Sequence, residues 1–123
     1  KNKSAEQPDF LPDILRIAAA AADRKAIDLK AYDVRGLTVI ADSFVLCSAS
    51  SEPQLKAILN AVRREMKEAG KHALHAEDEP SSGWMVLDFG DVIFHVFREE
   101  ARQYYDLDGL WGDAPLFSLD SVI

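Results

Sequence analysis

The stretch LDFGDVIFHVF, residues 87–97, holds the side chains whose types and spacing come closest to a chemical site. Asp88 and Asp91 flank a Phe-Gly pair that turns the chain back, and His95 follows within an apolar run. Two neighbouring carboxylates can hold a divalent cation or share a proton. The pattern is therefore compatible with a magnesium-dependent nucleotidyl- or phosphotransferase that uses Asp88 and Asp91. The competing explanation is structural, because aspartate is common at turns and a histidine fits a half-buried sheet face.

Other catalytic and cofactor-binding patterns are missing from the chain. Asp-Phe-Gly binds magnesium in protein kinases, but no glycine-rich loop, strand lysine or catalytic-loop motif accompanies it here. The sequence has neither a P-loop nor Gly-x-Gly-x-x-Gly for phosphates, and no Gly-x-Ser-x-Gly elbow for a nucleophile. His72 and His75 are not spaced to share a metal ion with His95. We therefore expect no metal, no cofactor and no enzymatic activity.

Aromatic residues gather at the ends of the predicted elements, next to acidic turns. Tryptophan and tyrosine in such places are typical anchors of protein interfaces, although closing the ends of a small core is the other explanation. Trp84 is the preferred anchor, because it opens a strand directly after a polar loop. The acidic side chains nearby would pair with lysine or arginine of a partner. The predicted partner-binding residues are Trp84, Met85, Asp88, Asp91, His95, Tyr104, Tyr105 and Trp111.

Hydrophobic periodicity predicts the elements that must position these residues. Helices are expected from about residue 10, over residues 51–70 and from residue 98, and strands near residues 27–32, 44–47, 72–76, 84–88 and 91–97. This order predicts an α/β (α+β) fold, a single domain with a mixed five-stranded sheet flanked by helices. The domain is placed at residues 10–114, between a flexible N-terminal tail at residues 1–9 and a C-terminal tail at residues 115–123.

The second helix has the clearest local signals. Ser51 can accept a hydrogen bond from the helix N-terminus, and Gln54 can reach back as its capping-box partner. Gly70 fits the left-handed position that ends many helices. The apolar stripe of this helix consists of Leu55, Ile58, Leu59, Val62 and Met66.

Composition limits the partners and the location of the chain. Its 123 residues are 48% hydrophobic, enough for a core, and carry a net charge of −7. Phosphate backbones are bound by basic patches, so a basic protein surface is a better partner than nucleic acid. Cys47 is the single cysteine, which excludes an internal disulfide and favours the cytoplasm. No apolar segment approaches the roughly 20 residues of a membrane helix. A homodimer that uses the aromatic end of the domain is a further alternative.

Residues 84–114, WMVLDFGDVIFHVFREEARQYYDLDGLWGDA, resemble the ribosomal silencing factor family, which includes the proteins once called Iojap-like. Residues 23–34 and 41–58 resemble two further blocks of that family, so the resemblance covers about residues 11–114. The chain departs from the pattern at Ser43, Ala49 and Asp78, where the family has an aromatic residue, a glycine and a glycine. The matching positions of the first block are Trp84, Asp88, Gly90, Asp91, Val92, His95, Val96, Phe97, Arg102, Tyr105, Leu110 and Trp111.

The resemblance implies a fold and a function without catalysis. The implied fold is similar to nucleotidyltransferases, but the resemblance implies no catalytic activity. The implied partner is the L-fourteen protein on the joining face of the large ribosomal subunit. Binding there implies a steric block of small-subunit joining and repression of translation, and a role in large-subunit biogenesis is considered as well. An acidic domain suits such a basic protein better than it suits ribosomal RNA.

Overall fold

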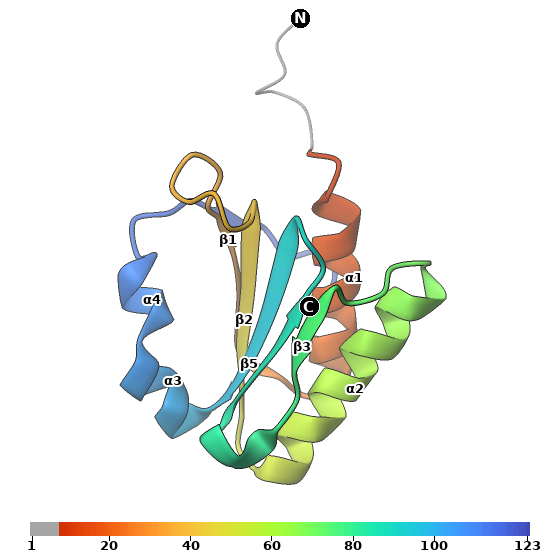
Figure 1. Ribbon diagram of the computed structural model, residues 1–123, viewed down its shortest axis with the longest axis vertical. Helices are drawn as coiled ribbons and strands as arrows, with labels where there is room; N and C mark the ends of the chain where they lie inside the picture. The colour runs from red at the N-terminus through yellow and green to blue at the C-terminus, as the bar shows by residue number, and fades with distance from the viewer. Residues whose placement is uncertain (1–7) are drawn as a thin grey trace, which may run out of the picture.

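The computed structural model describes residues 8–123, so residues 1–7 of the expected N-terminal tail lie outside the described residues. A six-stranded sheet is covered on one face by α1 and α2 and on the other by α3 and α4 (Figure 1). The elements are α1 (Leu11–Asp23), β1 (Ile27–Asp33), β2 (Ser43–Ala49), α2 (Glu52–Glu68), β3 (His75–Glu77), the 3-10 turn η2 (Pro80–Ser82), β4 (Trp84–Asp88), β5 (Val92–Arg98), α3 (Glu99–Tyr105), α4 (Leu107–Leu110) and β6 (Leu116–Phe117).

The sheet has the strand order β3-β4-β5-β2-β1-β6. Its central pair, β2 and β5, is parallel, and the other neighbouring pairs are antiparallel. Both central strands are buried along nearly their whole length. This burial follows from the layers, because strands covered by helices on both faces have no side open to water. The predicted mixed sheet flanked by helices is confirmed.

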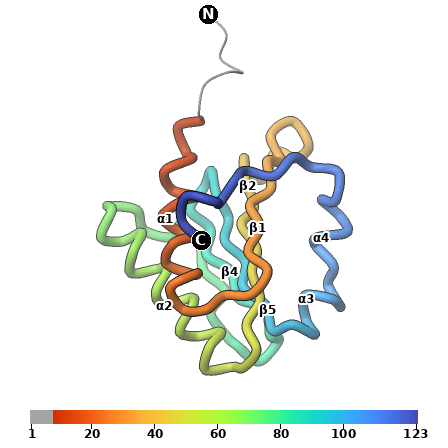
Figure 2. The backbone as a smooth tube through the Cα atoms, turned by 180° about the vertical axis from the view of Figure 1, so that it is seen from behind, coloured from red at the N-terminus to blue at the C-terminus, as the bar shows by residue number. Residues whose placement is uncertain are grey.

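The sheet has one strand more than predicted. Leu116–Phe117 pairs antiparallel with β1, although it belongs to the segment expected to be a C-terminal tail (Figure 2). The ring of Phe117 contacts that of Phe10 edge-on, with 5.8 Å between the ring centroids, and Leu119 is buried in the same core. Two residues are too few to show the alternation by which a strand is recognised in a sequence. The predicted count of five strands was wrong for this reason.

Two apolar cores lie on the two faces of the sheet. The first is between the sheet and the helices α1 and α2, and it contains the predicted stripe of α2. The second is between the sheet and the α3–α4 segment, with Trp84 and Trp111 packed against it. We call this group the second core; its buried members are Tyr32, Val34, Ala41, Phe44, Leu46, Ile93, Phe97, Ala101 and Ala114.

The predicted cap of α2 is confirmed, except that the Gln54 side chain bonds to Ser50 and not to Ser51. The Ser51 hydroxyl oxygen accepts a hydrogen bond from the Gln54 N–H at 3.2 Å. The Gln54 side-chain oxygen accepts from the N–H of Ser50, one residue earlier than a standard capping box, at 2.7 Å. Its amide group also donates to the carbonyls of Arg24 and Lys25 at 3.2 and 3.0 Å. Gln54 therefore joins the start of α2 to the end of α1.

Replacing Ser51 with alanine is expected to lower the free energy of unfolding by about 1 kcal/mol, because the first turn of α2 loses its side-chain acceptor. Urea unfolding followed by circular dichroism measures this change. The Ser51→Asp variant keeps an acceptor at the same place and should lose less stability. An alanine variant as stable as the unchanged chain would contradict this role of Ser51.

Candidate partner-binding face

Trp84 lies in a group of stacked aromatic rings on the α3–α4 side of the sheet. Its ring stacks on Phe97 with 5.2 Å between the centroids, because the register of β4 and β5 pairs these two residues. Tyr105 of α3 contacts the same indole with 4.6 Å between the centroids. Aromatic pairs at such separations attract one another beyond the area that they bury. Trp84 is only half-buried, so part of this group remains open to a partner.

His95 is the hydrogen-bond acceptor of Trp84. The indole Nε1–H donates to His95 Nδ1 at 3.0 Å, so the imidazole must be neutral there and carry its proton on Nε2. His95 is buried, and desolvation lowers the pKa of its imidazole from 6.5 to about 4. Its Nε2 has no hydrogen-bond partner among residues 8–123. His95 is therefore placed to orient the Trp84 ring from within the domain. The sequence had instead suggested that His95 contacts the partner directly.

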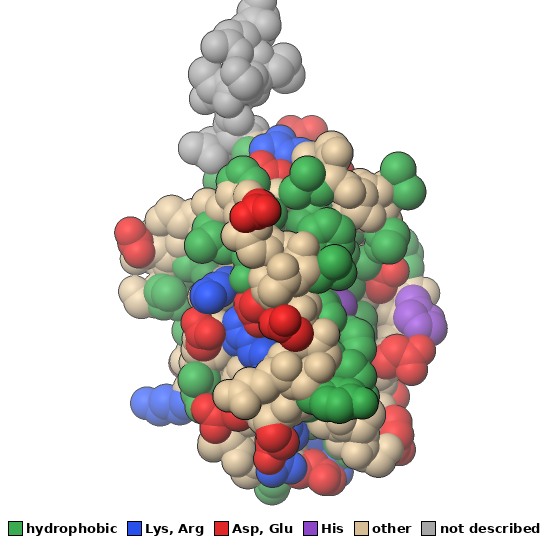
Figure 3. Space-filling view, turned by 90° about the vertical axis from the view of Figure 1, so that its left-hand side faces the viewer, with side chains coloured by type: hydrophobic (Ala, Val, Ile, Leu, Met, Phe, Trp, Pro, Cys, Tyr) green, Lys and Arg blue, Asp and Glu red, His purple; other side chains and the backbone are tan. Residues whose placement is uncertain are grey.

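Tyr104 and Trp111 extend the exposed aromatic surface on both sides of Trp84. Tyr104 is 81% exposed and meets Tyr105 edge-on, with 5.1 Å between the ring centroids. Trp111 is half-buried and contacts Phe44 of the second core at 5.3 Å. Apolar side chains form a band on this side of the molecule, with acidic groups beside it (Figure 3). We call the surface formed by Trp84, Tyr104, Tyr105 and Trp111 the aromatic face.

Met85 does not lie with the other predicted contact residues. Successive side chains of a strand point to opposite faces of the sheet. Met85 is therefore turned away from Trp84 and is buried in the first core, against α1 and α2. Met85 is buried, so its prediction as a partner-binding residue was wrong.

Asp88 and Asp91 serve the turn between β4 and β5. The Asp88 carboxylate accepts a hydrogen bond from the Gly90 N–H at 2.8 Å, and Gly90 has the positive φ of 92° that the turn requires. Asp91 is exposed, and its carbonyl oxygen accepts from the N–H groups of Asp42 and Ser43 at 2.8 and 3.0 Å. Both carboxylates lie at the end of the hairpin opposite Trp84. The structure thus does not bring the two aspartates together with Trp84.

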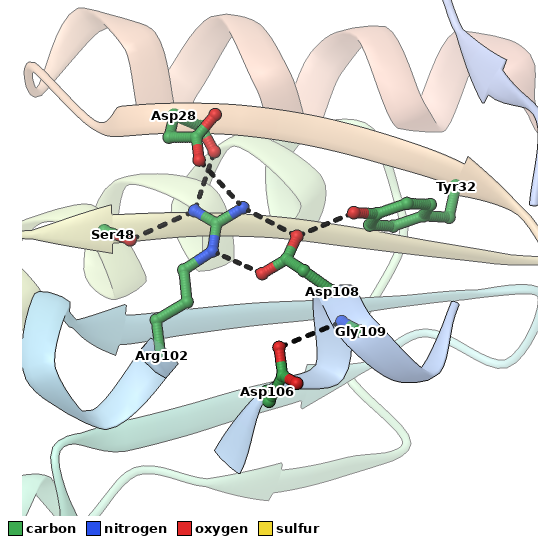
Figure 4. Close-up of polar contacts among 7 residues, drawn as sticks. All are labelled: Asp28, Tyr32, Ser48, Arg102, Asp106, Asp108 and Gly109. Carbon is green, nitrogen blue, oxygen red and sulfur yellow. Dashed lines mark hydrogen bonds and ion pairs between the residues drawn. The ribbon is translucent and has the colours of Figure 1, made fainter. Parts of the chain in front are cut away.

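Sequence reasoning missed the role of Arg102, which is the centre of a buried polar network (Figure 4). Its guanidinium donates two hydrogen bonds to the Asp108 carboxylate at 2.8 and 3.1 Å. A third nitrogen donates to the Asp28 carbonyl at 2.7 Å and to the Ser48 hydroxyl at 3.0 Å. The Tyr32 hydroxyl also donates to Asp108, at 2.7 Å. These bonds attach α3, which carries Tyr104 and Tyr105, and α4, which leads into Trp111, to strands β1 and β2.

The charges in this network stabilise one another. Hydrogen bonding from Arg102 lowers the pKa of the Asp108 carboxyl, and so does the Tyr32 hydroxyl. Burial, followed by the bond to Asp108, raises the pKa of Tyr32 far above its ordinary value. Asp28 has an unusual positive φ of 51° beside an irregularity in the β1 register. Such a bulge re-aims the backbone, and here the Asp28 carbonyl meets Arg102.

Two of the hollows on the surface of the described residues bear on the site. One, of about 490 Å³, adjoins the aromatic face and is lined in part by Pro80, Arg98, Tyr104 and Tyr105. The other, of about 630 Å³, lies across the sheet between α1 and α2 and contains none of the predicted site residues. Within residues 8–123, no group of three His, Cys, Asp or Glu side chains is placed to hold a metal ion. None of the helices described is long and apolar enough to cross a membrane.

A protein-family model described as "Ribosomal silencing factor during starvation" matches residues 7–123. The chain belongs to the ribosomal silencing factor family. The ribosomal silencing factor of Bacillus subtilis is 42% identical to it over 108 residues, which are 87% of this chain and 92% of that protein. The resemblance found in residues 84–114 is therefore confirmed.

Solved structures support the ribosomal silencing factor fold. A crystal structure of a Chromobacterium violaceum protein matches with a TM-score of 0.81 and 31% identity, covering 85% of this chain and 88% of that one. A Bacillus halodurans structure matches with a TM-score of 0.74 and 32% identity, covering 85% and 94% of the two chains. The single mixed α/β domain is thus an architecture that similar proteins also adopt.

Proposed function

We propose that the chain uses its aromatic face to bind the L-fourteen protein of the large ribosomal subunit. In this position it blocks joining of the small subunit sterically and represses translation. The observation that carries the proposal is the gathering of Trp84, Tyr104, Tyr105 and Trp111, partly exposed, on one face of the domain. Large aromatic side chains of this kind supply most of the binding energy in many interfaces. Membership of the ribosomal silencing factor family supports the ribosome as the target.

The charge of the chain supports a basic protein as the contact. A net charge of −7 repels RNA phosphates and attracts lysine- and arginine-rich surfaces, which speeds encounter and fixes orientation. A standard interface buries roughly 800 Å² per partner, an area that a domain of this size can provide. A steric block requires only that the domain binds tightly and occupies space. The proposal therefore includes no chemical step, metal or cofactor. The block takes place in the cytoplasm, where the subunits join, and the same contact would operate on large subunits during biogenesis.

The Tyr104→Ala variant tests this proposal with little risk to the fold, because the side chain is 81% exposed. We expect a loss of affinity for isolated large subunits of about tenfold, and about 30-fold for Trp84→Ala, which corresponds to a hot spot of about 2 kcal/mol. Co-sedimentation at increasing subunit concentration measures both values. The matched control is Ile123→Ala, which removes an exposed apolar side chain at the C-terminal end of the chain.

Subunit joining provides the functional measurement. The unchanged chain should reduce the fraction of joined ribosomes in a density gradient, and Tyr104→Ala should restore it. Melting temperatures of all variants separate lost binding from lost structure. If Tyr104→Ala and Trp84→Ala both bind large subunits as tightly as the unchanged chain, the aromatic face is not the contact and the proposal fails.

A further inference from the structure

The loop between β1 and β2 exposes more apolar surface than its role as a connection explains. Leu37 is 56% exposed, Ile40 is 67% exposed, and Val39 is fully exposed. Single apolar residues on a surface are ordinary, but a contiguous group usually marks an interaction site. We call Leu37, Val39 and Ile40 the loop tip.

The backbone under the loop tip is well bonded. The Val34 N–H donates to the Asp42 carbonyl at 3.0 Å, and the N–H groups of Leu37 and Thr38 donate to the Val34 carbonyl at 3.0 and 3.3 Å. The Ile40 N–H donates to the Thr38 hydroxyl at 3.2 Å. The tip is therefore held in one conformation before any partner arrives. A preorganised loop loses less conformational entropy on binding.

A salt bridge at the base of the loop adds to this preorganisation. The Arg35 guanidinium donates two hydrogen bonds to the Asp33 carboxylate at 2.9 and 2.7 Å. The same guanidinium lies over the rings of Phe10 and Phe117, 5.5 and 5.8 Å from their centroids. The positive charge nearest the tip is thus engaged within the domain and does not determine which partner the loop attracts.

The loop tip is continuous with the aromatic face. Val34 and Ala41, which flank the tip in the sequence, are buried in the second core. Trp84 and Trp111 of the aromatic face pack against the same core. The loop and α4 lie on the same side of the sheet in both views of the backbone (Figures 1 and 2). A partner seated on the aromatic face near Trp111 therefore comes close to the tip.

Acidic groups beside the loop tip indicate the chemistry of that partner. Asp42 lies two residues after Ile40, and its N–H donates to the carbonyl of the exposed Asp91 at 2.8 Å. The turn that carries Asp91 is thereby held next to the loop. Apolar side chains with carboxylates around them complement an apolar pocket lined with lysine or arginine, and they do not suit a phosphate backbone.

We infer that the loop tip is a second docking element, which enters an apolar pocket on the same basic protein that the aromatic face binds. The inference rests on the proposed function and deepens it by dividing the interface into two parts. The aromatic face supplies one anchor, and the loop tip, with Asp42 and Asp91 at its rim, supplies the other. Two anchors at different ends of the face fix the orientation of the bound domain, which a steric block requires.

The double variant Val39→Ser/Ile40→Ser tests the inference on isolated large subunits. We expect at least about a tenfold weaker binding with an unchanged melting temperature, because neither side chain is enclosed in the free domain. The conservative variant Val39→Leu/Ile40→Val should retain the affinity. Ile123→Ser, an equally drastic change at another exposed apolar residue, should also bind normally.

The outcomes separate this inference from the proposed function. If the double serine variant binds normally while Tyr104→Ala does not, the loop tip is not a docking element and the proposed function stands. If neither variant loses affinity, both ideas fail. If the double variant changes only the elution volume in sizing chromatography, the tip contacts a second copy of the chain, and the inference is overturned.

Discussion

Replacing Arg102 with alanine is expected to lower the free energy of unfolding by about 3 kcal/mol. The change removes the partner of the Asp108 carboxylate and leaves the Asp28 carbonyl and the Ser48 hydroxyl without their donor. Removing one partner of a buried ion pair costs about this much, because the remaining charge stays desolvated. Chemical unfolding measures the loss, and affinity for large subunits should fall as well, since α3 and α4 lose the Arg102 hydrogen bonds that hold them to β1 and β2.

An exposed arginine provides the matched control for Arg102. Arg63 also contacts a carboxylate, that of Asp78 at 3.4 Å, but both side chains are exposed. Its replacement by alanine should cost less than about 1 kcal/mol, as is usual for surface pairs. A double-mutant cycle of Arg102→Ala and Asp108→Asn should show strong coupling. Additive losses in that cycle would contradict the network as described.

Acidification is expected to destabilise the domain through His95. Burial lowers the pKa of this imidazole from 6.5 to about 4. Between these pH values the unfolded chain binds a proton that the folded chain does not, so stability is fully present above pH 6.5 and falls as the pH drops. The lowered pKa of the imidazole corresponds to a loss of roughly 3 kcal/mol of stability across this range. Unfolding curves recorded from pH 7 down to about pH 4 measure it.

The same titration acts on Trp84. A proton on His95 Nδ1 would face the indole Nε1–H, and two donors at 3.0 Å cannot form a hydrogen bond. The near-UV circular dichroism signal of tryptophan should therefore decrease as the pH falls, together with the stability. The His95→Gln variant should flatten the pH dependence, and His72→Gln, at an exposed position, should not. A His95→Gln variant with the original slope would rule out His95 as the responsible group.

Local signals in the sequence predicted much of the fold. The stripe of apolar residues and the Ser51 cap identified α2, and the tight turn at Gly90 identified the β4–β5 hairpin. The parallel pairing of β2 with β5 joins residues 49 positions apart, such as Ser43 and Val92, so local patterns could not specify it. The strand β6 was missed because two residues carry no periodicity.

The candidate site was predictable only in part. Trp84 was selected from its place at the start of a strand, but its bond to His95 joins residues 11 positions apart on neighbouring strands. Alternation along β4 would have excluded Met85 from the contact face, and that signal was present in the sequence. Arg102 matched the family pattern, but no local signal indicated its partners, because Ser48 and Asp28 lie 54 and 74 positions away. A charged residue on a short helix is ordinarily solvated, and only the assembled sheet encloses this one.

The parallel pairing at the centre of the sheet sets the order in which a nascent chain can complete the fold. Strand β2 bonds to β1 on one side and to β5 on the other. Until Val92 and the residues after it have been synthesised, the second side of β2 has no strand to pair with. A largely apolar strand with an open edge is prone to pair with other chains. Truncated or stalled products that end before β5 are therefore expected to need chaperone protection, whereas the completed chain shields its own central strand.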